Sequence, residues 1–95
     1  MSGEYAARRE DSPDSVTVLY FAALRDLAGR SEEQVRLAQS PEQVTALLEA
    51  LEQRHGALRG RLQAVRVAVN EEFVERSSEL RSGDVVALIP PVSGG

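Results

Sequence analysis

Val-Thr-Val-Leu-Tyr-Phe, at residues 16–21, predicts the first strand of the domain. β-Branched and aromatic residues favour strands. Apolar side chains here occupy both sets of alternating positions, which is typical of a central strand or of one whose second face binds something. A second apolar run, Asp-Val-Val-Ala-Leu-Ile at residues 84–89, ends at Pro90-Pro91, because proline cannot donate to a ladder of strands. We predict that these two runs pair in parallel at the centre of a sheet.

The clearest helix signal covers residues 41–55. Ser40 is a favoured N-cap residue, Pro41 suits the first helical position, and Gln43 would complete a capping box. Apolar residues then recur on one stripe of the helix, namely at Val44, Leu47, Leu48 and Leu51. Gly56 is expected to end the helix, whose stripe should cover one face of the sheet.

The remaining elements are shorter. Residues 22–28 indicate a short helix or turn closed by Gly29, and residues 33–38 alternate as a second strand. Residues 65–69 alternate as a third strand, and Phe73-Val74 is expected to start a short edge strand. This order predicts an α+β fold, specifically a β-grasp (ubiquitin-like) roll. Its mixed sheet would have roughly four to five strands, with one main helix packed on one face.

The chain is expected to divide into three parts. Residues 1–14 are rich in charged residues, serine and alanine, which is typical of a disordered N-terminal extension. Residues 15–89 would form the β-grasp domain, and residues 90–95 a flexible C-terminal Gly-Gly tail.

The composition excludes several classes of function. The 95-residue chain has no cysteine, which rules out disulfides, zinc–thiolate sites and cysteine nucleophiles. Its net charge of -4 and its two Tyr and two Phe argue against nucleic-acid binding. No apolar run approaches the roughly 20 residues that span a bilayer. We therefore expect a cytoplasmic protein without membrane contact.

The C-terminus carries the most informative motif. Gly94 and Gly95 pack against nothing, but they can thread a narrow channel and leave the last carboxylate open to reaction. Pro90-Pro91 stiffens the exit from the sheet, Val92-Ser93 continues it, and the six residues reach roughly 20 Å when extended. We interpret the Gly95 carboxylate as the reactive group. The alternative is a frayed end or a boundary without function.

Several stretches resemble one family. They are residues 18–22 and 24–29, Val67-Ala68-Val69-Asn70 before Phe73-Val74, residues 80–86, and the Pro-Pro-Val-Ser-Gly-Gly terminus. Together they cover about residues 16–95, and the chain closely resembles the small subunits of molybdopterin synthase. The terminus is the most specific of these motifs, because several other sulfur carriers and protein modifiers share only the Gly-Gly end.

The resemblance implies a β-grasp sulfur carrier that binds no cofactor of its own. In that family a ubiquitin-activating-type adenylyltransferase uses ATP and Mg²⁺ to adenylate the terminal carboxylate. A sulfur donor of the desulfurase or rhodanese type then converts it to a thiocarboxylate. The tail enters the large catalytic subunit of molybdopterin synthase and donates sulfur to cyclic pyranopterin monophosphate, in molybdenum cofactor biosynthesis. The active complex would be a heterotetramer, with the catalytic side chains in the large subunit.

One face of the sheet should remain uncovered, because a single helix covers only the other. Phe21, Phe73 and Ile89 match the family's hydrophobic docking patch, although ordinary core positions are the alternative where strand register is uncertain. Arg25 either pairs with an acidic group of a partner or is a solvated surface residue.

Two other features have structural explanations. His55, the only histidine, lies at the predicted helix C-terminus and is expected to complement the helix dipole. Glu71-Glu72 is expected to lie in a solvated turn, so we predict no metal site.

Three other functions stay open on the sequence. The chain could be a sulfur carrier for thiamine, cysteine or tRNA thiolation, a ubiquitin-like protein modifier, or an interaction module with an inert tail. The Pro-Pro-Val-Ser context before the glycines favours the molybdopterin pathway.

Overall fold

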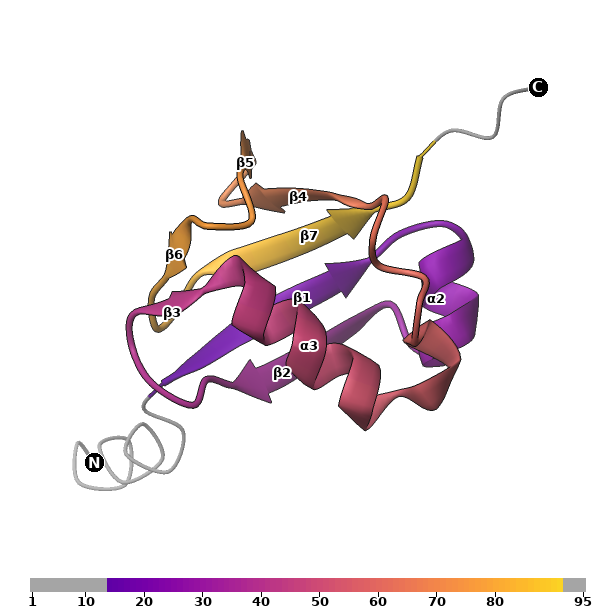
Figure 1. The fold of residues 1–95 in the computed structure, drawn as a ribbon, viewed down its shortest axis with the longest axis horizontal. Helices are drawn as coiled ribbons and strands as arrows, with labels where there is room; N and C mark the ends of the chain where they lie inside the picture. Colours follow the sequence, from indigo (N-terminus) through magenta and orange to yellow (C-terminus); the bar gives the residue numbers. More distant parts are fainter. Residues whose placement is uncertain (1–13, 92–95) are drawn as a thin grey trace, which may run out of the picture.

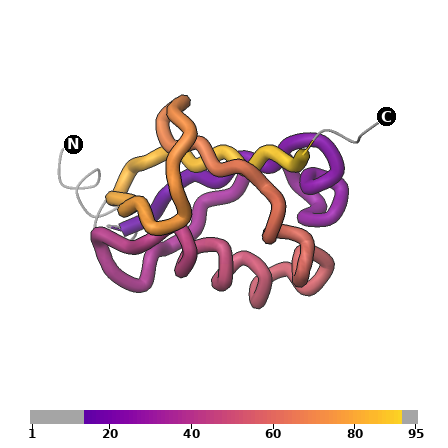
Figure 2. Tube along the Cα trace, turned by 45° about the horizontal axis from the view of Figure 1, so that its top comes forward, coloured from indigo at the N-terminus to yellow at the C-terminus, as the bar shows by residue number. Residues whose placement is uncertain are grey.

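The computed structural model describes residues 14–91 of the chain, and the structural statements below refer to that part. A five-stranded mixed sheet forms one layer and the main helix forms the other (Figure 1 and Figure 2). In chain order the elements are β1 (Ser15–Tyr20), α2 (Ala23–Ala28), β2 (Glu32–Arg36), β3 (Glu42–Gln43), α3 (Val44–Arg54), η1 (Gly56–Leu58), β4 (Arg66–Val69), β5 (Glu72–Val74), β6 (Glu79–Leu80) and β7 (Val85–Ile89).

The two apolar runs lie side by side at the centre of the sheet, as predicted. The strand order is β2-β1-β7-β4-β5, in which β1 and β7 are parallel and the other neighbours are antiparallel. Val18 lies opposite Val86, and Tyr20 lies opposite Leu88. Because β1 and β7 are parallel, their C-terminal ends meet at the same end of the sheet, beside α2 (Figure 1). This arrangement confirms the β-grasp prediction.

The face of the sheet that packs on α3 forms the core. The predicted helical stripe is buried, with Val44 and Leu51 fully so, and it faces inward-pointing strand residues such as Val18 and Val86. Burial of each such side chain stabilises the fold by about 1.5–3 kcal/mol relative to leaving it in water. The 3.6-residue period of the helix and the two-residue period of the strands therefore predicted the core correctly.

The start of the helix was predicted wrongly. Ser40 is not its N-cap and Pro41 is not in its first turn, because α3 begins only at Val44. Gln43 occupies the cap position without any side-chain capping bond. Glu42 and Gln43 instead form β3, which pairs with β6 in a second, two-stranded sheet.

Backbone carbonyls of the neighbouring segment take over the capping. The N–H of Val44 donates to the carbonyl of Ser78 over 2.9 Å, and the N–H of Thr45 donates to that of Arg76 over 3.0 Å. The hydroxyl of Thr45 donates to the same Arg76 carbonyl. These acceptors lie more than 30 residues away in the chain, so a local capping motif could not reveal them.

The shorter helical elements follow the sequence closely. α2 ends at Gly29, which has a φ of 78° and donates its N–H to the carbonyl of Arg25, as expected of a glycine helix end. α3 ends at Arg54 with His55 as its C-cap, and Gly56 begins the 3₁₀ turn η1. The helix therefore ends one residue before the predicted boundary.

The predicted extension and tail fall mostly beyond the described part of the chain, since residues 1–13 and 92–95 lie outside it. Within residues 14–91, no helix is long and apolar enough to cross a bilayer.

Candidate functional site

The face of the sheet that points away from α3, called the outer face below, is built from alternate residues of the strands. Leu19 of β1 lies opposite Ala87 of β7, and Ala87 lies opposite Ala68 of β4. Ala68 in turn lies opposite Phe73 of β5. Alternate residues of a strand share a face, so the outer face of β1, β7, β4 and β5 is defined by Thr17, Leu19, Val85, Ala87, Ile89, Arg66, Ala68 and Phe73, with Phe21 following β1.

Large apolar side chains are exposed on the outer face. Phe21 is 44% exposed, Phe73 is 55% exposed and Val85 is 38% exposed, and these are the exposed large hydrophobic side chains of the described chain. Contiguous exposed apolar surface commonly marks an interaction site. The predicted surplus apolar face is therefore real, and it includes Phe21 and Phe73.

A shallow groove lies over the parallel strand pair. Its volume is about 460 Å³, and it is lined by Leu19, Phe21, Asn70, Glu71, Val85 and Ala87. The floor is apolar, and the turn between β4 and β5 forms a polar rim. A partner could insert an apolar side chain here without entering the core.

The rim of this groove is held by hydrogen bonds. Val85 donates its N–H to Asn70 Oδ1 over 3.0 Å, and Asn70 donates its own N–H to the Val85 carbonyl over 2.8 Å. Asn70 Nδ2 also donates to Asp84 Oδ1 over 3.0 Å. Asn70 and Glu71 both have positive φ, as in a tight mirror-image hairpin turn. The turn prediction for Glu71 is confirmed, whereas Glu72 belongs to β5.

The other predicted docking residues occupy distinct positions. Phe73 lies two strands away from the groove, and the guanidinium carbon of Arg66 is 4.0 Å from the centroid of its ring. Ile89 is half-buried at the end of β7, opposite Arg66. Arg25 is exposed on α2.

The predicted reactive tail leaves from the end of β7. Pro90 is half-buried and Pro91 is exposed. Val92, Ser93, Gly94 and Gly95 lie outside the described residues. The structure therefore places the base of the tail directly after Ile89, at the C-terminal end of β7.

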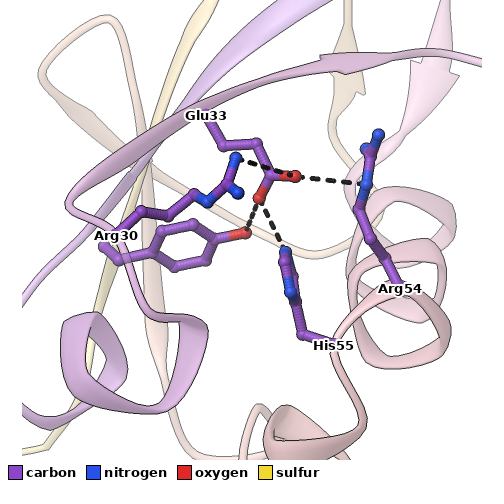
Figure 3. A network of polar contacts seen from close by, with 5 residues as sticks. Arg30, Glu33, Arg54 and His55 are labelled. Atoms are coloured by element: carbon purple, nitrogen blue, oxygen red, sulfur yellow. Dashed lines mark hydrogen bonds and ion pairs between the residues drawn. The ribbon is translucent and has the colours of Figure 1, made fainter.

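The sequence interpretation missed a cluster around the buried carboxylate of Glu33, on the inner face of β2 (Figure 3). The hydroxyl of Tyr20 donates to Glu33 Oε1 over 2.8 Å, and His55 Nε2 contacts the same oxygen at 2.8 Å. Arg54 Nε is 3.1 Å from Glu33 Oε2, and Arg30 Nη1 is 4.0 Å from it. The rings of Tyr20 and His55 also meet edge to face.

The cluster corrects the role predicted for His55. Its ring contacts Glu33 and Tyr20, so it links α3 to β2 and β1 and does not serve mainly to complement the helix dipole. Two signals in the sequence pointed to the cluster. Glu33 alternates in phase with buried Val35, and Tyr20 alternates in phase with buried Val18.

Two pKa shifts reflect the cluster. Burial tends to raise the pKa of Glu33, but hydrogen bonds from His55 and Tyr20 and the charges of His55 and Arg54 outweigh it and lower the pKa. Burial, followed by the hydrogen bond to Glu33 and its negative charge, raises the pKa of Tyr20 well above the usual range. Glu33 therefore stays ionised and Tyr20 neutral at ordinary pH, which suits a structural role.

Among residues 14–91, no group of three or more His, Asp or Glu side chains could hold a metal ion.

Residues 18–95 of the chain match the ThiS family. The chain belongs to the ThiS family. It is 38% identical over 80 residues to the molybdopterin synthase sulfur carrier subunit of Mycobacterium tuberculosis, covering 84% of this chain and 96% of that protein. It is 35% identical over 85 residues to the human protein of the same name, covering 84% of this chain and 93% of that one.

Solved structures agree on the fold. SAMP1 from Haloferax volcanii superposes with a TM-score of 0.77 at 31% identity, covering 85% of this chain and 99% of that one. A chain from the complex of subunits 1 and 2 of the molybdopterin-converting factor of Helicobacter pylori gives a TM-score of 0.61 at 24% identity, covering 85% of this chain and 99% of that one. The β-grasp assignment therefore rests on topology and on similarity to solved structures together.

Proposed function

We propose that this ThiS-family protein is the sulfur carrier subunit of a molybdopterin synthase. The observation that carries the proposal is the match to relatives of that name over nearly their whole length. The exposed apolar outer face beside the base of the tail supports it, because a carrier must dock on partners while its terminus reacts.

The reactive group in this proposal is the carboxylate of Gly95. A carboxylate is a poor electrophile, so ATP first converts it to an acyl adenylate with release of pyrophosphate, on an adenylyltransferase that binds the ATP and Mg²⁺. A persulfide on a donor protein of desulfurase or rhodanese type then displaces AMP and forms an acyl disulfide. A thiol reduces this acyl disulfide, which releases the thiocarboxylate and leaves a disulfide between the thiol and the donor. Gly94 lets the backbone pass a narrow channel, while Pro90-Pro91 directs the tail away from the sheet.

Transfer of the sulfur to its acceptor would take place in a large catalytic subunit. There the thiocarboxylate of Gly95 donates its sulfur to cyclic pyranopterin monophosphate, and this chain supplies no catalytic side chain. The Helicobacter pylori complex of subunits 1 and 2 supports a partner of this kind. A heterotetramer of two small and two large subunits is the assembly that we propose.

The energetics of the outer face suit a carrier that exchanges partners. Burying Phe21, Phe73 and Ile89 would yield at most roughly 5–9 kcal/mol before costs, because all three are already partly buried. Association costs about 4–15 kcal/mol, so the face alone binds weakly. Insertion of the tail must add the remaining affinity, and release of the tail then allows the carrier to leave.

Intact-mass spectrometry tests the proposal. The protein is incubated with the adenylyltransferase of its own organism, ATP, Mg²⁺ and a sulfur donor. We expect exchange of one oxygen for sulfur, located at Gly95 by fragmentation. Omission of ATP is the control. A protein that forms neither adenylate nor thiocarboxylate with active partners would contradict the proposal.

A second candidate function is that of a ubiquitin-like protein modifier. The similarity to SAMP1, a small archaeal modifier protein, favours it. The acyl adenylate would then react with a lysine amine to give an isopeptide bond and AMP. Because the chain has an arginine at position 81 and no later basic residue, trypsin would leave residues 82–95 attached to the target lysine. That branched peptide is the product to seek by mass spectrometry.

A further inference from the structure

Arg66 is the one charged residue on the outer face of the three central strands, at the end of the sheet where β4 begins and β7 ends. The other outer-face residues of the three central strands β1, β7 and β4 are all uncharged, namely Thr17, Leu19, Val85, Ala87, Ile89 and Ala68. Arg66 lies opposite Ile89, the last residue of β7, and over the ring of Phe73. Its neighbours are therefore two of the apolar side chains that the proposed function assigns to docking.

The donors of Arg66 are available to a partner. Among residues 14–91, its one hydrogen bond, ion pair or ring interaction is the stacking on Phe73, at 4.0 Å from the ring centroid. Arg54, by contrast, pairs with Glu33, and Arg76 donates to three backbone carbonyls. Stacking covers one flat side of the guanidinium and leaves the N–H groups along its edge free to donate.

A partner that covers the outer face must supply a hydrogen-bond acceptor for the guanidinium of Arg66. An apolar surface laid over the outer face would remove water from the guanidinium, and a buried cation without an acceptor is strongly unfavourable. A carboxylate matches the planar fork of an arginine with two parallel hydrogen bonds. An apolar partner surface with one acidic side chain opposite Arg66 is thus the best complement to Phe73, Ile89 and Arg66 together.

We propose that Arg66 is a specificity-determining residue, and that the large subunit of molybdopterin synthase places one Asp or Glu carboxylate against its guanidinium when it covers the outer face. This rests on the proposed function of the chain and adds the chemistry of the partner surface. The ring of Phe73 holds the guanidinium in position and leaves its edge accessible to the partner. The pairing selects partners with an acid at that position and disfavours purely apolar surfaces.

Three variants and a matched control test the pairing by calorimetric titration with the large subunit of the same organism. Arg66→Met keeps an unbranched chain over Phe73 but removes the charge, and we expect at least a tenfold loss of affinity. Arg66→Lys keeps the charge without the fork and should lose severalfold. Arg66→Glu should lose the most. Arg36→Met, which removes an exposed arginine from the edge strand β2, should bind within twofold of the unmodified protein.

A double-mutant cycle identifies the acid. Each Asp and Glu of the large subunit is changed to Asn or Gln and paired with Arg66→Met, and we expect one position at which the two losses are clearly non-additive. Melting temperatures of the Arg66 variants should stay near that of the unmodified protein, which separates pairing from folding.

The outcomes distinguish this inference from the proposed function. If Arg66→Met binds as tightly as the unmodified protein, or if every cycle is additive, the carboxylate pairing is wrong while the carrier function stands. If Arg66→Met slows adenylation and leaves binding to the large subunit unchanged, the activating enzyme is the partner and this assignment is overturned. If the unmodified protein forms no complex with the large subunit, both the inference and the proposed function fail.

Discussion

Tyr20 and Glu33 join β1 to β2 by a side-chain hydrogen bond of 2.8 Å on the inner face of the sheet, near the end from which the tail leaves. Tyr20 points inward, and the next residue, Phe21, is exposed at the groove on the outer face. The buried carboxylate cluster and the proposed docking face therefore meet at adjacent residues. Substitutions in the cluster should first lower the free energy of unfolding of the domain.

Glu33→Ala should destabilise the domain by about 2–4 kcal/mol, because it leaves Tyr20, Arg54 and His55 without their shared acceptor. Urea unfolding followed by circular dichroism measures this loss. Glu32→Ala is the matched control, since its side chain is exposed on the same strand, and it should change stability by less than about 0.5 kcal/mol. Equal losses for the two variants would contradict a structural role for the cluster.

Stability should fall in acid through Glu33. Its pKa is lowered in the folded protein from an ordinary value of 4.5. The ionised form is therefore favoured by folding, and its contribution is complete above that ordinary value and lost as the pH falls through the folded pKa. Melting temperature measured from pH 7 to pH 3 should drop less steeply for Glu33→Gln than for Glu32→Gln. Parallel curves would show that other carboxylates carry the acid sensitivity.

Arg76→Lys should destabilise the domain by about 1–3 kcal/mol. Arg76 Nη2 lies within hydrogen-bonding distance of the carbonyls of Leu62, Gln63 and Val65, at 2.8–3.0 Å, and a lysine cannot present a planar fork to them. Arg81→Lys is the control, because Arg81 makes an exposed pair with Glu79. Denaturant midpoints at constant m-value provide the measurement, and equal midpoints for both variants would refute this role.

The periodic parts of the sequence predicted the fold. The features that the sequence analysis missed depend on long-range contacts. The buried stripe from Val44 to Leu51 and the two apolar runs were correct, because burial depends on a local repeat. The capping box at Ser40 failed because carbonyls of Arg76 and Ser78 satisfy the first N–H groups of α3.

The same reason separates the site residues that were found from those that were missed. Phe21 and Phe73 could be predicted, since a surplus of apolar side chains follows from strand alternation and a single covering helix. Glu33 was missed although it alternates in phase with Val35, because a glutamate in an edge strand is ordinarily a surface residue. Its partners His55 and Arg54 lie on another element, so no local pattern joins them to it. Arg66 was missed because its importance depends on the absence of charge among the neighbouring outer-face residues.

Phe21→Ala and Leu51→Ala should separate docking from folding. Phe21 is 44% exposed, so its removal should cost little stability but about tenfold or more in affinity for the large subunit. Leu51 is fully buried in the core, so Leu51→Ala should cost about 2–5 kcal/mol of stability. Its affinity should be nearly unchanged at temperatures at which it is folded. Calorimetry and urea unfolding on the same samples provide both numbers, and a reversed pattern would remove Phe21 from the docking face.

Deletion of Gly95 should abolish sulfur loading and leave the domain folded. The deletion shortens the reach of the terminus by about 3.3–3.6 Å, and a carboxylate that far from the reacting phosphorus of ATP cannot be adenylated. Stability should not change, because within residues 14–91 the last strand ends at Ile89 and the last core residue is Leu88. Addition of one alanine after Gly95 should abolish sulfur loading as well, since it displaces the carboxylate in the opposite direction.

Ser93→Ala, which keeps the length of the tail, is the control and should still be loaded. Intact mass after incubation with the adenylyltransferase, ATP and a sulfur donor measures loading, and the melting temperature measures folding. A shortened protein that still acquires sulfur would show that the reactive group is not the Gly95 carboxylate.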